Sequence, residues 1–446
     1  MQDLGIISPS LEEFRERAVT HRVIPVCIKI LADSLTPIGI YRSLVLHDGA
    51  ADPGTFLLES AKIATEGESA AWDRYSFIGA SSRSTLTTRD GKIYWQGQTP
   101  AGAPTEGDPV EAIDQTLRML HTEPVPGLPP LTSGLVGYLG WDVVRRWENL
   151  PYPPADDVNL PEFALNMVSD MAIHDNTDGT VLLIANAINF NDTDENVDDA
   201  YVDAVERLHR MLQQLEQGAS ETASVLTGVS EVNARIHREV TQTWSVQGYQ
   251  DAIDRCKKNI IDGDVFQIVI SRRFEVETGA DALDVYRVLR QSNPSPYMYL
   301  FNFEDAEGIP FQIVGSSPEA LVTLKEGRAT SHPIAGSRPR GATREQDIAL
   351  AEELLADQKE RSEHLMLVDL ARNDLSRIAK PGTVSVDEFM VIERFSHIMH
   401  ISSSVSAELD PQFSAYDVLR VAFPAGTLSG APKPRAMQLI DEYEPT

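Results

Sequence analysis

Short apolar runs separated by turn-forming residues fill most of the first 190 residues of this 446-residue chain. Their β-branched and aromatic content, with Gly and Pro between them, is typical of β-strands. This pattern restricts the fold more than any other feature, because the backbone groups of a strand need partners in a sheet. The clearest runs are TFLLESAKI (55–63), RYSFIGAS (74–81), SGLVGYLGW (133–141) and TVLLIANAI (180–188).

The composition changes between residues 191 and 245. NDTDENVDDA (191–200) leads into YVDAVERLHRMLQQLEQ (201–217), whose apolar residues recur near helical spacing, and a polar stretch follows. We therefore predict an α/β domain over 1–190, an acidic helical connector over 191–245 and a second domain over 246–446.

Helical and strand patterns follow one another in the second half. The predicted helices are 249–262, ended by Gly263, then 282–293, stopped before Pro294, and 343–375, with a capping-box pattern at Thr343 and Gln346. Strand patterns occupy 265–277, 311–327 and 391–409. The predicted class is α+β, or mixed α/β.

Charge and cysteine content limit the function. With 38 basic and 67 acidic residues the net charge is −29, which disfavours binding to nucleic acid or to an anionic membrane. Only Cys27 and Cys256 occur, too few for a disulfide framework. The N-terminus lacks a signal-peptide pattern and no run of 18 apolar residues exists, so we expect a cytoplasmic protein.

Candidate chemistry lies in a few polar clusters. Glu360 and Glu363 in DQKERSEHLML (357–367) share one helix face and could bind a hard cation; alternatively, Asp357 is an N-cap and the glutamates lie on a solvated face. His397 and His400 in SHIMHIS (396–402) should point to opposite faces of a strand, so that one of them can line a pocket.

Two glycine-rich segments are typical of anion contacts. HPIAGSRPRG (332–341) combines glycines with arginines that can clamp a carboxylate. FPAGTLSGAPKPRAM (423–437) does not have the spacing of a phosphate-binding P-loop. It can still form a turn that leads into a helix whose N-terminus contacts an anion. Glu319 in SSPEA lies at a predicted turn, at the surface or at a pocket rim.

Taken together, these stretches resemble the large subunit of anthranilate synthase (component I), over nearly the whole chain. The second half carries the resemblance most specifically, in GDVFQIVISRRF, NPSPYMYL, SHPIAGSRPRG, KERSEHLMLVDLARNDLSRI, FSHIMHISS and FPAGTLSGAPKPRAM. FLLESA, RYSFIG and GLVGYLGWD add to it in the first half. The resemblance implies the chorismate-utilising enzyme fold, a large β-sandwich-like core of antiparallel sheets flanked by helices.

The resemblance also implies a reaction, in which a carbon–oxygen lyase converts chorismate and ammonia to anthranilate and pyruvate in tryptophan biosynthesis. It implies Mg²⁺ as cofactor and a hetero-oligomer with a glutamine amidotransferase subunit (component II) that supplies the ammonia. By resemblance, Glu363 and Glu360 are metal residues, and Gln267, Gly336 and Ser337 bind substrate. His400, Glu319 and Thr427 are catalytic, with Glu319 as the general acid for the departing hydroxyl.

Two small or neutral residues distinguish this chain from related families. A sister family that makes aminodeoxychorismate often has a nucleophilic Lys where Ala335 stands. Isochorismate and salicylate synthases have a water-activating Lys where Gln267 stands. The absence of both amines favours direct attack by ammonia over these alternatives.

The resemblance implies tryptophan feedback as well. Its binding residues are Leu58, Glu59 and Ser60 on one side and Pro296, Tyr297 and Met298 on the other. Members of the family usually continue beyond the final DEYEPT, so we expect the C-terminal part of the catalytic domain to be missing. An alternative interpretation is therefore a truncated, catalytically incompetent remnant that binds tryptophan or a subunit.

Overall fold

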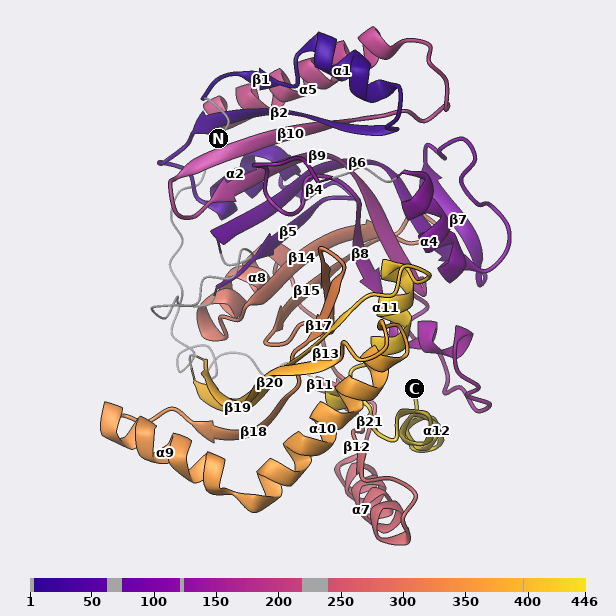
Figure 1. Ribbon diagram of the computed structural model, residues 1–446, viewed down its shortest axis with the longest axis vertical. Helices are drawn as coiled ribbons and strands as arrows, with labels where there is room; N and C mark the ends of the chain where they lie inside the picture. The colour runs from indigo at the N-terminus through magenta and orange to yellow at the C-terminus, as the bar shows by residue number, and fades with distance from the viewer. Residues whose placement is uncertain (1–3, 62–73, 121–123, 219–239, 396) are drawn as a thin grey trace. The chain divides into compact units, whose positions relative to one another are not determined.

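The computed structural model describes residues 4–61, 74–120, 124–218, 240–395 and 397–446 (Figure 1). The chain forms two compact units, each assembled from separated stretches of sequence. Unit 1 is Met1–Gly140, Leu160–Ser224 and Asp281–Pro318, and unit 2 is Trp141–Asn159, Val225–Ala280 and Glu319–Thr446.

A ten-stranded antiparallel sheet forms the centre of unit 1 as far as it is described. Its order is β1-β2-β10-β9-β6-β5-β14-β15, with β7 paired to β6 and β8 to β9. The runs predicted as strands in the first half fall in β5, β6, β8 and β10. The bounds are β1 Ile7–Ser8, β2 Val23–Leu31, β5 Phe56–Glu59, β6 Tyr75–Arg89, β7 Lys92–Gly97, β8 Leu135–Leu139, β9 Phe163–Asp175, β10 Thr180–Ile188, β14 Tyr297–Glu304 and β15 Pro310–Ser317.

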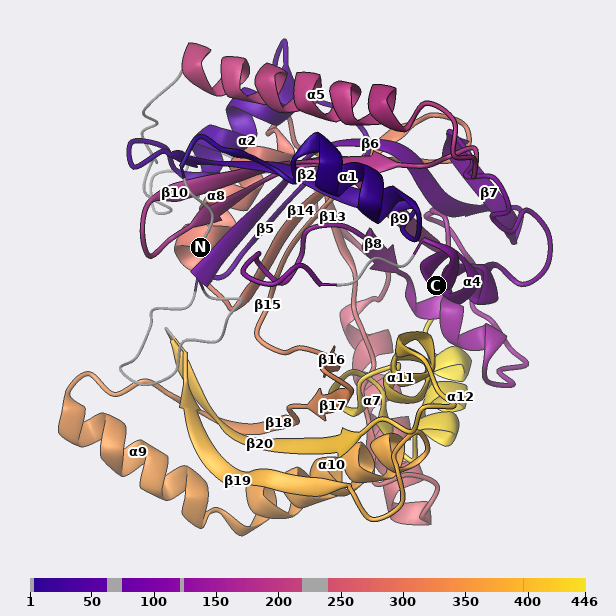
Figure 2. The ribbon, with the colours of Figure 1, turned by 45° about the horizontal axis from the view of Figure 1, so that its top comes forward.

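Both faces of this sheet are buried, which explains why β10 is apolar without interruption. Val181 and Leu183 enter one core, whereas Leu182 and Ile184 enter the other. The first core lies under α1 (Leu11–Ala18), α2 (Pro37–Val45), α5 (Val197–Gln217) and α8 (Ala282–Ser292), as Figure 2 shows. Around the second core the sheet curls, because Tyr138 of β8 contacts Phe303 of the non-adjacent strand β14. The expected α+β class, with antiparallel sheets and flanking helices, is confirmed. Among the described residues, the remaining elements of unit 1 are the hairpin β3 (Leu46–His47) and β4 (Ala50–Ala51), and α4 (Pro109–Met119).

The two units differ from the predicted linear division. Helix α5 is part of unit 1, since Leu208 and Met211 are buried in its core, so residues 197–217 do not act as a free connector. Strands β14 and β15 extend the sheet of unit 1 because β14 pairs with β5. Sequence order alone could not indicate this long-range pairing.

Unit 2 contains a second antiparallel sheet, in which β20 pairs with β19 on one side and with β17 and β18 on the other, and β16 pairs with β17. Helices α9, α10 and α11 pack against it through two apolar clusters. The bounds are η1 Trp141–Arg146, β11 Val240–Gln242, α7 Val246–Asp262, β12 Gln267–Ile268, β13 Phe274–Val276, β16 Thr323–Lys325, β17 Arg328–Ser331, β18 Ile334–Pro339, α9 Arg344–Ala356, α10 Gln358–Ser376, β19 Ser385–Arg394, β20 Ile398–Glu408, α11 Ala415–Ala422, η2 Gly426–Leu428, β21 Gly430–Ala431 and α12 Lys433–Tyr443.

Several predicted boundaries in the second half are confirmed and others are corrected. Gly263 ends α7 in the left-handed conformation, and α8 stops before Pro294. The predicted helix 343–375 is instead two helices, because Asp357 adopts an extended conformation and caps α10. Of the capping box only the Thr343 half forms, since the Gln346 side chain accepts from the backbone of Ala342. The predicted strand 265–277 consists of the short strands β12 and β13.

Candidate active site

A β-bulge in β18 places the predicted substrate loop beside the predicted catalytic histidine. The register of β18 against β20 shifts between Ala335 and Ser337, and Gly336 between them has φ +65°. The Gly336 carbonyl accepts a hydrogen bond from His400 Nδ1 over 2.8 Å. A neutral imidazole that donates from Nδ1 keeps the lone pair of Nε2 as a proton acceptor. His397, by contrast, is exposed just before β20 begins.

The first turns of α10 bring two carboxylates to the same region. Asp357 caps the helix by accepting from the backbone N–H groups of Lys359 and Glu360. A Cβ added to Gly336 would lie 3.1 Å from Glu360 Oε2, and the left-handed backbone at φ +65° also favours glycine at this close approach of the substrate loop to the carboxylate. Glu363, one turn further along, accepts a hydrogen bond of 3.2 Å from Gln267 Nε2.

These side chains fit a divalent cation that keeps most of its water. Mg²⁺ is commonly held by one or two carboxylates together with water and substrate oxygens. Glu360 and Glu363 provide the carboxylates, and Oε1 of Gln267 is buried without a hydrogen-bond partner. No group of three or more His, Cys, Asp and Glu residues suited to a metal occurs in the described part of the chain. The site therefore requires water or substrate to complete the ligand set.

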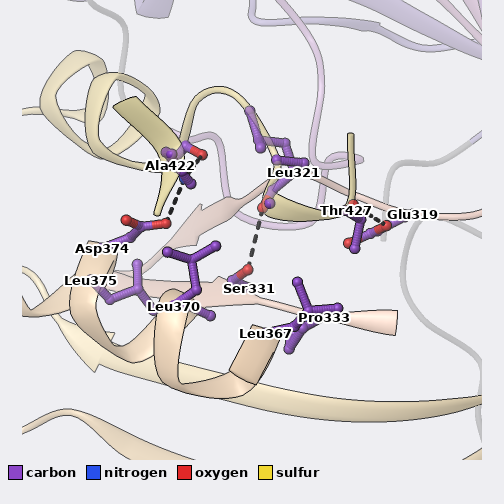
Figure 3. Close-up of a pocket in the computed structure, with 14 residues that line it drawn as sticks. Glu319, Leu321, Ser331, Pro333, Leu367, Leu370, Asp374, Leu375, Ala422 and Thr427 are labelled. Atoms are coloured by element: carbon purple, nitrogen blue, oxygen red, sulfur yellow. Dashed lines mark hydrogen bonds and ion pairs between the residues drawn. The ribbon is translucent and has the colours of Figure 1, made fainter. Parts of the chain in front are cut away.

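The predicted general acid lies in a small cavity of unit 2 (Figure 3). Glu319 is half-buried, and its Oε2 accepts a hydrogen bond of 3.2 Å from Thr427 Oγ1. Burial raises the pKa of the Glu319 carboxyl from 4.5 to about 7, while the bond from Thr427 acts in the opposite direction. A carboxyl with this pKa holds its proton near neutral pH and can donate it.

One face of α10 runs from the carboxylates to this cavity. At 100° per residue, Glu360, Glu363, Leu367, Leu370 and Asp374 fall on a single stripe of the helix. The last three line the cavity together with Glu319 and Thr427. The predicted catalytic, substrate and metal residues thus all belong to unit 2, and those on α10 share one face.

The same cavity contains a buried ion pair that was not predicted from the sequence. Lys433 Nζ lies 2.6 Å from Asp374 Oδ2, and both side chains are nearly enclosed. Burial raises the pKa of Asp374 and lowers that of Lys433. The helical spacing of Asp374 from Glu363 was available in the sequence, but nothing local indicated that Lys433 is its partner.

The residues predicted to bind tryptophan lie together in unit 1. Strands β5 and β14 pair with Glu59 opposite Met298 and Leu58 opposite Tyr299. Because side chains alternate along a strand, Leu58 and Glu59 point to opposite faces of the sheet. Glu59 is buried and accepts a hydrogen bond of 2.6 Å from Tyr286.

Glu59 also pairs with a helix of unit 1. The Nε of Arg290 in α8 lies 3.2 Å from Glu59 Oε2. The carboxylate is therefore compensated within the fold before any ligand arrives. Ser60 and Pro296 are half-buried and Tyr297 is more exposed, so these three side chains are the more accessible members of the set.

The chain is similar to chorismate-utilising proteins along its length. Residues 60–446 match the family model described as chorismate binding enzyme. Anthranilate synthase component 1 of Arthrobacter globiformis is 59% identical over 100% of this chain and 82% of its own length. The protein of the same name from Mycolicibacterium smegmatis is 53% identical over 98% of this chain and 80% of its own length.

Solved structures agree in fold. Anthranilate synthase component I from Streptococcus pneumoniae matches with a TM-score of 0.69 and 29% identity, over 86% of this chain and 79% of that one. The menaquinone-specific isochorismate synthase of Escherichia coli matches with a TM-score of 0.62 over 98% of this chain and 85% of that one; at 15% identity it shows the fold alone. In the described part of the chain no helix is long and apolar enough to cross a membrane.

Proposed function

Because the chain belongs to the anthranilate synthase component 1 family of chorismate-binding enzymes, we propose that it converts chorismate and ammonia to anthranilate, pyruvate and water. The observation that carries the proposal is the Glu319–Thr427 pair. It places a carboxyl with a pKa of about 7 in a cavity lined by the helix that also presents Glu360 and Glu363.

In the first chemical step Glu319 acts as the general acid. The nitrogen of ammonia forms a bond to ring C2 and then releases one proton to water, the ring double bonds shift, and the C4–O bond breaks. Glu319 gives its proton to the departing hydroxyl, which leaves as water, and Thr427 keeps the resulting carboxylate hydrogen-bonded.

The second step eliminates pyruvate. A base removes the proton at C2, the bond between C3 and the enolpyruvyl oxygen breaks, and the ring becomes aromatic. The leaving group departs as the enolate of pyruvate and takes up a proton at its methylene carbon. The Nε2 atom of His400 has the free lone pair that this proton requires, because Nδ1 is engaged by Gly336. Gly336 and Ser337, in the adjoining bulge, would contact the substrate.

The proposed reaction also requires Mg²⁺ and a source of ammonia. Glu360 and Glu363 would hold Mg²⁺ through oxygen ligands, and the ion would supply positive charge for the ring carboxylate in an otherwise acidic protein. Ammonia would come from a glutaminase partner, component II. The absence of an amine at Ala335 and at Gln267 supports direct attack by ammonia.

Feedback inhibition by L-tryptophan is the regulatory part of the proposal. The paired strands β5 and β14 bring Ser60 near Pro296 and Tyr297, next to the buried Glu59 and its partially exposed partner Arg290. A pocket with an aromatic wall and few polar anchors suits an indole amino acid.

An anthranilate fluorescence assay tests the activity. The purified protein is incubated with chorismate, Mg²⁺ and excess ammonium at alkaline pH, and products are identified by mass spectrometry. We expect anthranilate, and we expect Glu363→Gln to reduce its formation at least 100-fold while leaving the circular dichroism spectrum unchanged. Aminodeoxychorismate, isochorismate or salicylate as the product would replace the proposal, and tryptophan binding without turnover would indicate a regulatory protein.

A further inference from the structure

The segment that carries Thr427 is held between three helices of unit 2. It spans residues 423–432, from the end of α11 to the start of α12, and contains η2 and β21. Within η2, Gly426 packs so closely on α10 that an added Cβ would lie 2.3 Å from Leu370 Cδ2. The position of Thr427 therefore depends on how this segment is fixed to its neighbours.

Lys433 ties both ends of the segment with one side chain. It is the first residue of α12, and its Nζ donates to the carbonyl of Ala422, the last residue of α11, over 2.8 Å. The same ammonium donates to Asp374 of α10 over 2.6 Å. Lys433 is only 8% exposed, so water competes little for these bonds.

We propose that Lys433 is a positioning residue that holds Thr427 in hydrogen-bonding contact with Glu319. The ammonium closes the 423–432 segment into a loop and anchors it on α10, which lines the cavity of Glu319. Figure 3 shows the Glu319–Thr427 bond and the Asp374–Ala422 region at different ends of this cavity, with Leu370 and Leu367 between them. Lys433 acts through the loop, and its consequence for catalysis rests on the function proposed above.

The proposal has an electrostatic consequence that a purely structural ion pair would not have. The bond from Thr427 stabilises the ionised form of Glu319 and so opposes the effect of burial on its pKa. The titratable side chains that line the cavity are Glu319, Asp374 and Lys433. If the loop loosens, Thr427 withdraws and the pKa of Glu319 rises further above its ordinary value.

The test measures that pKa directly in the whole protein. Glutamate is labelled with ¹³C at the carboxyl carbon, and the Glu319 signal is assigned by its loss in Glu319→Gln. We expect Thr427→Val and Lys433→Met each to raise the pKa of Glu319 by about one pH unit, the size of one lost hydrogen bond. The double variant should raise it no further, because both changes remove the same interaction.

Two further variants separate positioning from stability. Val418→Ala truncates a buried residue of α11 and should destabilise unit 2 without moving the Glu319 pKa. Lys433→Met combined with Asp374→Leu replaces the ion pair by apolar side chains. This double variant should fold even if Lys433→Met alone does not, because it leaves no unpaired charge in the cavity. An unchanged pKa in this folded double variant, or additive shifts with Thr427→Val, would overturn the proposal.

Turnover gives an independent result. Under the proposed function, Lys433→Met should lower kcat about 10- to 100-fold, with KM changed much less, and Lys433→Arg should recover part of the loss. If Lys433→Met and Thr427→Val shift the Glu319 pKa non-additively but no variant or parent forms anthranilate, the proposed function is rejected and the positioning role stands. If anthranilate forms at the normal rate but Lys433→Met leaves the Glu319 pKa unchanged, the positioning role is rejected and the proposed function stands.

Discussion

At the residue scale, the burial of Glu319 sets the chemistry of the candidate active site. An ordinary glutamate is ionised at pH 7, whereas desolvation in this cavity raises the pKa of Glu319 to about 7. Because the folded state holds this proton more tightly than the unfolded chain, the free energy of unfolding falls as the pH rises from about 4.5 to about 7. The raised pKa that suits Glu319 to act as an acid near neutral pH therefore also lowers the free energy of unfolding there.

Glu319→Gln should remove this pH-dependent loss. We expect the variant to be more stable than the parent protein at pH 8 by about 1–3 kcal/mol, with a smaller difference near pH 4.5, where the parent carboxyl is protonated in the folded state and about half protonated in the unfolded chain. Urea unfolding at the two pH values measures this. The same variant should form anthranilate at least 100-fold more slowly, because the glutamine amide cannot donate a proton to the departing hydroxyl. An equal stability difference at both pH values would contradict the raised pKa.

At the element scale, the site depends on a close approach between the bulge of β18 and the first turn of α10. Gly336 has a left-handed backbone, and its missing Cβ leaves room for Glu360 and for Leu354. Arg338 of the same strand reinforces the approach, since it donates to Asp357, the N-cap of α10. The strand that carries the substrate loop is thereby tied to the helix that carries the carboxylates.

Gly336→Ala should therefore have two effects. The left-handed conformation costs a non-glycine residue about 1 kcal/mol of stability, and the added Cβ also pushes the Glu360 side chain away. We expect Mg²⁺ affinity, measured by calorimetry, to fall at least fivefold. Gly382→Ala is the matched control, since Gly382 has φ +82° and no atom within 4 Å of an added Cβ. Equal Mg²⁺ affinity in both variants would remove Glu360 from the metal site.

At the scale of the whole molecule, the proposed catalytic and regulatory residues belong to different units. The chorismate and metal residues are in unit 2, and the tryptophan residues are in unit 1. Inhibition would then be a coupling free energy between two sites, with tryptophan binding one functional state more tightly. Such coupling predicts that the regulatory site can be weakened without loss of the catalytic one.

Glu59→Gln tests this separation. The amide no longer attracts Arg290, which should cost about 1–2 kcal/mol of stability and rearrange the strand edge beside Ser60. We expect tryptophan affinity to fall at least tenfold by calorimetry, with the uninhibited rate within twofold of the parent. Asp198→Asn, which breaks the exposed pair with Arg15 in the same unit, should change neither quantity. Unchanged tryptophan affinity in folded Glu59→Gln would place the regulatory site elsewhere.

Local signals in the sequence were sufficient for much of this protein. Apolar runs located strands such as β5 and β10, Gly263 and Pro294 located helix ends, and motif resemblance located the family. Helical periodicity placed Glu360 and Glu363 on one face. These features depend on a few neighbouring residues or on the order of motifs along the chain, which a linear sequence displays directly.

Only the tertiary structure decided the rest. The pairing of β14 with β5, the burial that raises the pKa of Glu319, and the ion pair of Lys433 with Asp374 join residues far apart in the chain. Many partners at such distances are compatible with the same local pattern. The desolvation and hydrogen bonding of a side chain depend on which residues pack against it. The chemistry of these side chains could therefore be derived only once the fold was known.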